Sequence, residues 1–145
     1  MHTYLLPLNL HIHYGMDVDG QIHHCLSKHM FHYSFVRHIF LDEALWSRAY
    51  ENRSLTIGYK QTISQPYIVA KMTEHLISHT SKRGRVMNKI LEIGSGCGYQ
   101  SAVLSYFADE ICAVERVKPL VMKSRENLRE LGIRNILIKH ADGFE

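Results

Sequence analysis

The stretch 89–98 (KILEIGSGCG) constrains this chain more than any other, because it joins an apolar strand to a helix through a glycine turn. The short run of Ile90, Leu91 and Ile93 predicts a strand buried on both faces of a parallel sheet. The glycines at 94, 96 and 98 allow positive φ and let a ligand approach the main chain closely. The segment therefore predicts an α/β fold that holds a nucleotide-like cofactor at this turn.

The spacing of the glycines and a later carboxylate refine that prediction. The third glycine comes one residue earlier than in the dinucleotide pattern G-x-G-x-x-G, so a pyrophosphate site is less well supported. A second apolar strand over 110–115 (EICAVE) ends in Glu115, about 20 residues after Gly94. A carboxylate at that place can accept hydrogen bonds from ribose hydroxyl groups. The alternative is a structural glycine turn followed by a surface glutamate.

The rest of the chain after residue 58 alternates between helix and strand patterns. Helices are predicted from Pro66 and over 99–107 and 119–131, and a third strand is predicted over 135–142 (NILIKHAD). This alternation indicates βαβ units with right-handed crossovers. Each strand ends in a candidate ligand contact. Open α/β sheets bind ligands at the carboxyl ends of their parallel strands. In residues 35–58 the aromatic and aliphatic residues recur without a clean period, so this segment is predicted to be a cap region rather than a sheet.

Thr62 and Ser64 lie immediately before the helix that begins at Pro66. Serine and threonine often cap helices, which gives both residues a purely structural explanation. If Pro66 is the first helical residue, however, Gln65 takes the cap position and the Ser64 hydroxyl group is free. The sequence leaves capping and function as two alternatives for Ser64.

Composition excludes several classes of protein. A chain of 145 residues fits one compact domain, and its three widely spaced cysteines do not suggest a disulfide framework. No apolar run is long enough to cross a membrane, and the first residues do not resemble a signal peptide, so we expect a cytoplasmic protein with no membrane partner. A net charge of +3 does not indicate nucleic-acid binding.

Residues 1–34 form an atypical segment rich in histidine. The pairs His11-x-His13 and His29-x-x-His32, together with Cys25, raise the alternative of a metal site. Zinc sites usually show a more regular paired spacing than this. We therefore expect no metal site and regard 1–34 as an idiosyncratic terminal segment.

From about residue 37 to its end, the chain resembles the protein-L-isoaspartate O-methyltransferases of bacterial type. The matching motifs are VRHIFLDEA, IGYKQTISQPYIVAKM, KILEIGSGCGYQSAVLS, ICAVER and HADG, in order and at compatible spacing. The glycine turn alone indicates only an S-adenosylmethionine-dependent methyltransferase, whereas QTISQPYIVA is far more specific. The segment before Phe35 departs from the family pattern, and Val36 stands where proline is common.

The resemblance implies a Rossmann-like fold and methyl transfer from the cofactor S-adenosylmethionine to the α-carboxylate of L-isoaspartyl residues in damaged proteins. It implies that Ser64 is the catalytic residue, which orients the reacting carboxylate. Cys97 is expected to be a small turn residue, because this reaction needs no covalent intermediate. The implied cofactor-binding residues are Thr62, Ile63, Glu92, Gly94, Ser95, Gly96, Gly98, Glu115, Asp142 and Gly143.

Members of this family continue past the Asp-Gly pair with further strands. In a sheet ordered 3-2-1-4-5 this chain supplies strands 3, 2 and 1, so residues 35–145 are expected to be the N-terminal part of a methyltransferase domain. The open edge of strand 1 is a liability for aggregation or dimerisation, which makes self-association a further expected interaction. The alternatives are an inactive remnant that at most binds the cofactor or a partner chain, a methyltransferase with another substrate, and a histidine-rich metal-binding protein.

Overall fold

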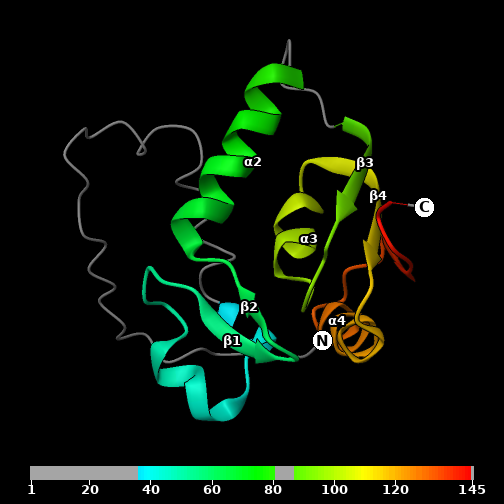
Figure 1. Ribbon diagram of the computed structural model, residues 1–145. Helices are drawn as coiled ribbons and strands as arrows, with labels where there is room; N and C mark the ends of the chain where they lie inside the picture. Colours follow the sequence, from blue (N-terminus) through cyan, green and yellow to red (C-terminus); the bar gives the residue numbers. More distant parts are fainter. Residues whose placement is uncertain (1–35, 81–86, 145) are drawn as a thin grey trace, which may run out of the picture.

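The computed structural model describes residues 36–80 and 87–144, and its main element is a three-stranded parallel sheet (Figure 1). The strands are β3 (Met87–Ile93), β4 (Ala108–Glu115) and β5 (Ile136–His140), in the order β3-β4-β5. The helix α3 (Tyr99–Leu104) connects β3 to β4, and α4 (Lys118–Glu130) connects β4 to β5. The predicted α/β class and strand order are confirmed, although α3 is shorter than the helix predicted over 99–107.

The two faces of the sheet differ in how far their side chains are buried. Ile90 and Ile111 are buried on one face and pack with Leu104 of α3. On the other face Leu91 and Ile93 are 67% and 64% exposed. The prediction of a strand buried on both faces is therefore wrong for β3, because no element among the described residues covers the face that carries Leu91 and Ile93.

An antiparallel hairpin precedes the main sheet. Its strands are β1 (Leu55–Gly58) and β2 (Gln61–Ile63), and β2 leads into the long helix α2 (Pro66–Thr80). Two short 3-10 helices, η1 (Arg37–Phe40) and η2 (Glu43–Arg48), come before it. The prediction of a cap region without sheet over 35–58 is therefore wrong for β1.

The hairpin and α3 share one hydrophobic core. Leu55, Ile57 and Ile63 of the hairpin are buried in the same cluster as Ala102 and Val103 of α3. Figure 1 shows α3 between α2 and β3, with the hairpin at the foot of α2. This shared core places the end of β2 beside the turn that follows β3.

A membrane span and a metal site were both predicted to be absent from the chain, and the structure bears on them only for the described residues. Among the helices of 36–80 and 87–144, none is both long and apolar enough to span a bilayer. The same residues contain no group of three or more histidine, cysteine or acidic side chains arranged to hold a metal ion. The histidine pairs and Cys25 of the segment 1–34 lie outside the described part of the chain.

Candidate functional site

The loop after β2 and the glycine turn after β3 together line a hollow of about 60 Å³. Six of the predicted site residues lie around it: Thr62, Ile63, Ser64, Gly94, Ser95 and Gly96. The other lining residues are Val69, Cys97, Tyr99 and Gln100. Sequence reasoning assigned no ligand role to Val69, Tyr99 or Gln100. The position of Tyr99 and Gln100 directly after the glycine turn was the signal that could have indicated them.

The geometry before α2 excludes helix capping, one of the two alternatives for Ser64. The carbonyl oxygen of Gln65 accepts hydrogen bonds from the N–H groups of Ile68 and Val69, at 3.1 and 3.2 Å, so Gln65 holds the cap position. Ser64 is exposed, and its hydroxyl group forms no hydrogen bond with the described residues. The hydroxyl group therefore does not cap α2 and is available to a ligand.

The glycines of the turn divide into two roles. Gly94 and Gly98 have φ of 84° and 91°, which only glycine adopts easily. A Cβ atom built on Gly94 would meet nothing within 4 Å, so a ligand can approach the backbone there. A Cβ atom built on Gly98 would lie 3.1 Å from Cβ of Ser124 on α4, so this glycine permits close packing of the turn on α4.

Ser95 supplies a buried polar atom without a partner. The residue is 5% exposed, and its Oγ atom forms no hydrogen bond among the described residues. A buried hydroxyl group without a partner costs about 1–3 kcal/mol. A polar ligand in the hollow that reaches Ser95 Oγ would remove this cost, which makes the glycine turn chemically suited to such a ligand.

Glu115 lies at the end of β4 and holds the turn by its carboxylate. Its Oε2 atom accepts a hydrogen bond of 2.9 Å from the N–H group of Gly96, and its Oε1 atom accepts one of 2.8 Å from Val117. The residue is buried and does not line the hollow. Each carboxylate oxygen can accept a second hydrogen bond, so a ribose contact remains compatible with this arrangement.

Glu92 lies on β3 beneath the turn, beside α3. Its Oε2 atom accepts a hydrogen bond of 2.5 Å from the hydroxyl group of Ser101. Burial raises the pKa of Glu92 to about 7. Glu92 therefore changes its charge near neutral pH.

Asp142 and Gly143 follow β5 and do not line the hollow. Asp142 is exposed, and its Oδ1 atom accepts a hydrogen bond of 3.2 Å from the N–H group of Phe144. A Cβ atom built on Gly143 would collide with the side chain of Ile93, so the turn after β5 passes close to the end of β3. The segment that follows β5 thus reaches the carboxyl end of β3, although β4 lies between the two strands.

Cys97 is a buried residue of the turn. Burial raises the pKa of its thiol to about 11, so the thiol is protonated at neutral pH. Nucleophilic cysteines react as thiolates. This environment supports the interpretation of Cys97 as a small turn residue.

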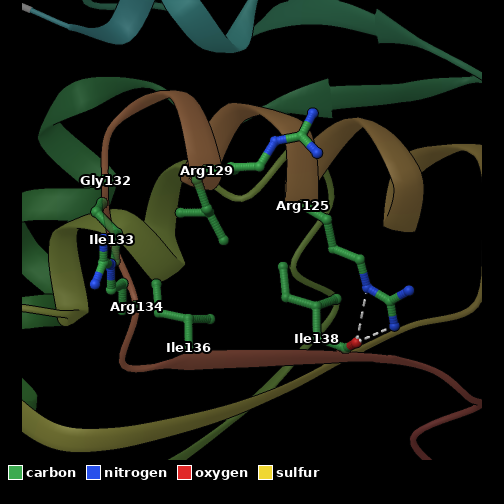
Figure 2. A pocket seen from close by; sticks show the side chains of 8 residues that line it. Arg125, Arg129, Gly132, Ile133, Arg134, Ile136 and Ile138 are labelled. Atoms are coloured by element: carbon green, nitrogen blue, oxygen red, sulfur yellow. Dashed lines mark hydrogen bonds between the residues drawn. The ribbon is translucent and has the colours of Figure 1, made fainter.

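A larger hollow of about 240 Å³ lies between α4 and β5, apart from every predicted site residue (Figure 2). At one end of it Arg125 donates hydrogen bonds of 3.2 and 2.5 Å, from Nε and Nη2, to the carbonyl oxygen of Ile138. The N–H group of Ile111 bonds to Asn135, and that of Ala141 bonds to Glu115. Since alternate residues of β5 pair with β4, the Ile138 carbonyl points out of the sheet, and Arg125 caps this edge strand.

Comparison with known proteins identifies relatives over most of the chain. The family model of protein-L-isoaspartate(D-aspartate) O-methyltransferase matches residues 21–145. The protein-L-isoaspartate O-methyltransferase of Methylobacillus flagellatus is 62% identical over 107 residues, which cover 74% of this chain and 46% of the relative. Protein-L-isoaspartate O-methyltransferase 1 of Marinobacter nauticus is 58% identical over 107 residues, with the same coverage. The chain thus spans about half the length of these curated relatives.

Solved structures share the fold. A protein-L-isoaspartate O-methyltransferase superposes with a TM-score of 0.65 at 26% identity, covering 82% of this chain and 39% of that one. A Plasmodium falciparum protein assigned to the same enzyme family, in complex with S-adenosyl-L-homocysteine, superposes with a TM-score of 0.63 at 22% identity. That match covers 81% of this chain and 57% of the other. The predicted Rossmann-like methyltransferase fold is confirmed.

Proposed function

The chain belongs to the protein-L-isoaspartate O-methyltransferase family, and from this premise we propose that it transfers a methyl group from S-adenosylmethionine to the α-carboxylate of L-isoaspartyl residues in damaged proteins. One observation carries the proposal. The free hydroxyl group of Ser64 lines the same hollow as the open backbone of Gly94 and the unpartnered hydroxyl group of Ser95. The two motifs that resemble the family's substrate and cofactor segments therefore meet at one place.

The residues around the glycine turn fit a cofactor of this kind. Gly94 leaves room for close approach to the main chain, and Ser95 Oγ offers a hydrogen bond to a polar group. A hollow of about 60 Å³ is much smaller than the roughly 300 Å³ or more of an ordinary ligand pocket, so these residues would form one wall of the cofactor site. When bound, S-adenosylmethionine would supply an activated methyl group on a positively charged sulfur.

Ser64 would act on the substrate by orienting it. A carboxylate has a pKa of about 4 and is already ionised at neutral pH, so it needs no general base. The Ser64 hydroxyl group would donate a hydrogen bond to one carboxylate oxygen and leave the other free to attack. Thr62 and Ile63 would form the wall beside this group and help to exclude water.

The test is methyl transfer by the purified chain. It is incubated with methyl-labelled S-adenosylmethionine and either an isoaspartyl peptide or the same peptide with a normal aspartyl linkage. We expect label in the isoaspartyl peptide only. Equal labelling of both peptides would contradict the proposed substrate. A chain that binds S-adenosylhomocysteine in calorimetry but transfers no methyl group would contradict the activity itself.

The role of Ser64 is tested with a matched pair of variants. Ser64→Ala removes one hydrogen bond to a charged group, worth about 1.5–3 kcal/mol, so kcat should fall about 10- to 100-fold. Ser78→Ala makes the same chemical change at an exposed position of α2, outside the hollow, and should leave kcat unchanged. Equal activity of the two variants would exclude the proposed role of Ser64.

A further inference from the structure

Arg37 on η1 is a fully buried cation whose partners are carbonyl oxygens. Its Nη2 atom donates hydrogen bonds to the carbonyl oxygens of Ser64, at 2.8 Å, and Arg53, at 3.2 Å, and its Nη1 atom donates one to that of Ala49. None of the ion pairs among the described residues involves Arg37. Burial lowers the pKa of its guanidinium group.

One of these hydrogen bonds fixes the backbone of Ser64, the proposed catalytic residue. Arg37 holds the backbone carbonyl of Ser64, while the Ser64 side chain is exposed at the hollow. The same guanidinium group holds Arg53, just before β1, and Ala49, just after η2. A planar group with several donors in fixed directions can hold three carbonyls at once, which an ammonium group on a flexible stem cannot do in the same geometry.

The guanidinium group also lies over the ring of Tyr99, the residue that follows the glycine turn. Its central carbon atom lies 5.5 Å from the centre of the Tyr99 ring, within the range of a cation–π contact. Tyr99 is buried, begins α3 directly after Gly98, and lines the hollow. Arg37 therefore lies between the two walls of the hollow, one that carries Ser64 and one that carries the turn.

We propose that Arg37 is a positioning residue, which sets the distance between Ser64 and the glycine turn. This inference builds on the proposed function. A hydroxyl group that orients a substrate must be held accurately with respect to the methyl donor, because a misplacement of about 1 Å can cost about 100-fold in rate. The loss of Arg37 should therefore lower kcat and leave the KM for the peptide nearly unchanged.

The experiment compares Arg37→Lys with Leu128→Val in the full chain. Leu128 is a buried residue of α4 that lines the larger hollow between α4 and β5 and not the hollow at the glycine turn, so its truncation lowers stability without touching the candidate site. The two variants are assayed at temperatures equally far below their own melting points. We expect Arg37→Lys to lose about 100-fold in kcat, with KM changed less than threefold, and Leu128→Val to keep its kcat. Equal kcat values for the two variants would overturn the proposal.

A second measurement separates this inference from the proposed function. The carbonyl carbon of Ser64 is labelled with ¹³C, and its resonance is recorded in the unmodified chain and in both variants. Arg37→Lys should shift this resonance and speed amide exchange around residues 64–69, and Leu128→Val should leave the resonance in place. These results would support the proposal that Arg37 anchors the Ser64 backbone even if the chain transferred no methyl group. An unshifted Ser64 resonance in Arg37→Lys would overturn that proposal.

Discussion

The hydroxyl group of Ser101 on α3 donates a hydrogen bond of 2.5 Å to Oε2 of Glu92 on β3. Ser101 is fully buried, so the carboxyl group is held between the helix and the sheet. Burial raises the pKa of Glu92 to about 7, the hydrogen bond from Ser101 opposes the shift, and the charge of Glu115 adds to it. This carboxyl group therefore changes its charge near neutral pH, two residues before the glycine turn begins at Gly94.

The free energy of unfolding should fall as pH rises because of Glu92. The folded state binds the Glu92 proton more tightly than the unfolded chain, where the pKa is 4.5. The stabilising contribution is complete below about pH 4.5 and is lost as pH rises through about 7. In Glu92→Gln this pH dependence of the free energy of unfolding is absent. The difference in free energy of unfolding between Glu92→Gln and the unmodified chain should therefore shift by about 2 kcal/mol in favour of the variant from pH 5 to pH 8, as measured by urea denaturation.

Glu110→Gln is the control for that measurement. Glu110 is exposed, and its hydrogen bond from Lys89, at 3.0 Å, lowers its pKa. Its contribution to stability therefore changes below pH 4.5, outside the range of the experiment. Glu110→Gln should keep the slope of the unmodified chain between pH 5 and pH 8. If Glu92→Gln keeps the same slope, the raised pKa is wrong.

Gly143→Ala should destabilise the turn after β5 through a collision with Ile93. The φ of Gly143 does not lie in the left-handed region, so the new Cβ atom acts by its contact with the Ile93 side chain. Overpacking of this kind costs about 1–3 kcal/mol. Ile93→Ala alone should cost little, because Ile93 is exposed. In a double-mutant cycle the cost of Gly143→Ala should largely disappear in the Ile93→Ala background; an unchanged cost would exclude the collision.

Asn52→Ala should lower the free energy of unfolding by about 1 kcal/mol. The Oδ1 atom of Asn52 accepts a hydrogen bond of 3.0 Å from the N–H group of Tyr67, in the first turn of α2. Asn52→Asp keeps the acceptor and adds a negative charge at the helix N-terminus, so it should retain full stability. Asn88→Ala, at an exposed position of β3, serves as the control. Equal stability of Asn52→Ala and Asn88→Ala in urea denaturation would show that the hydrogen bond from Tyr67 to Asn52 contributes nothing.

The sequence predicted the parts of the fold whose signals are local. Apolar runs before a glycine or an acid gave β3, β4 and β5, and Pro66 marked the start of α2. The β1–β2 hairpin was missed because Tyr59 and Lys60 in its turn adopt φ of 54° and 57°. Hairpin turns of this kind usually carry Asn-Gly or a similar pair, so Gly58 indicated a turn but the residues after it did not indicate a hairpin.

The sequence motifs indicated part of the candidate site, whereas the parts that depend on tertiary contacts were missed. Ser64 and Ser95 were assigned by the family resemblance, and the structure places both at one hollow. Arg37 lies in the matching motif VRHIFLDEA, but its role depends on carbonyl oxygens that lie 12, 16 and 27 residues further along the chain, and the motif does not indicate those contacts. The hydrogen bond from the N–H group of Gly96 to Glu115 also arises only when β3 and β4 pair.

Cys97 should resist alkylation in the folded chain, whereas Cys112 should react. A thiol with a pKa raised from 9.0 to about 11 forms about 100-fold less thiolate at pH 8, and Cys97 is also buried. Cys112 is only half-buried, on the face of the sheet that also carries Leu91. Iodoacetamide labelling followed by peptide mass spectrometry should therefore detect modified Cys112 first, and modified Cys97 only after urea unfolds the chain. Labelling of unfolded chain at both positions is the control. Equal rates at Cys97 and Cys112 in the folded chain would contradict the buried, protonated state of Cys97 and restore it as a candidate nucleophile.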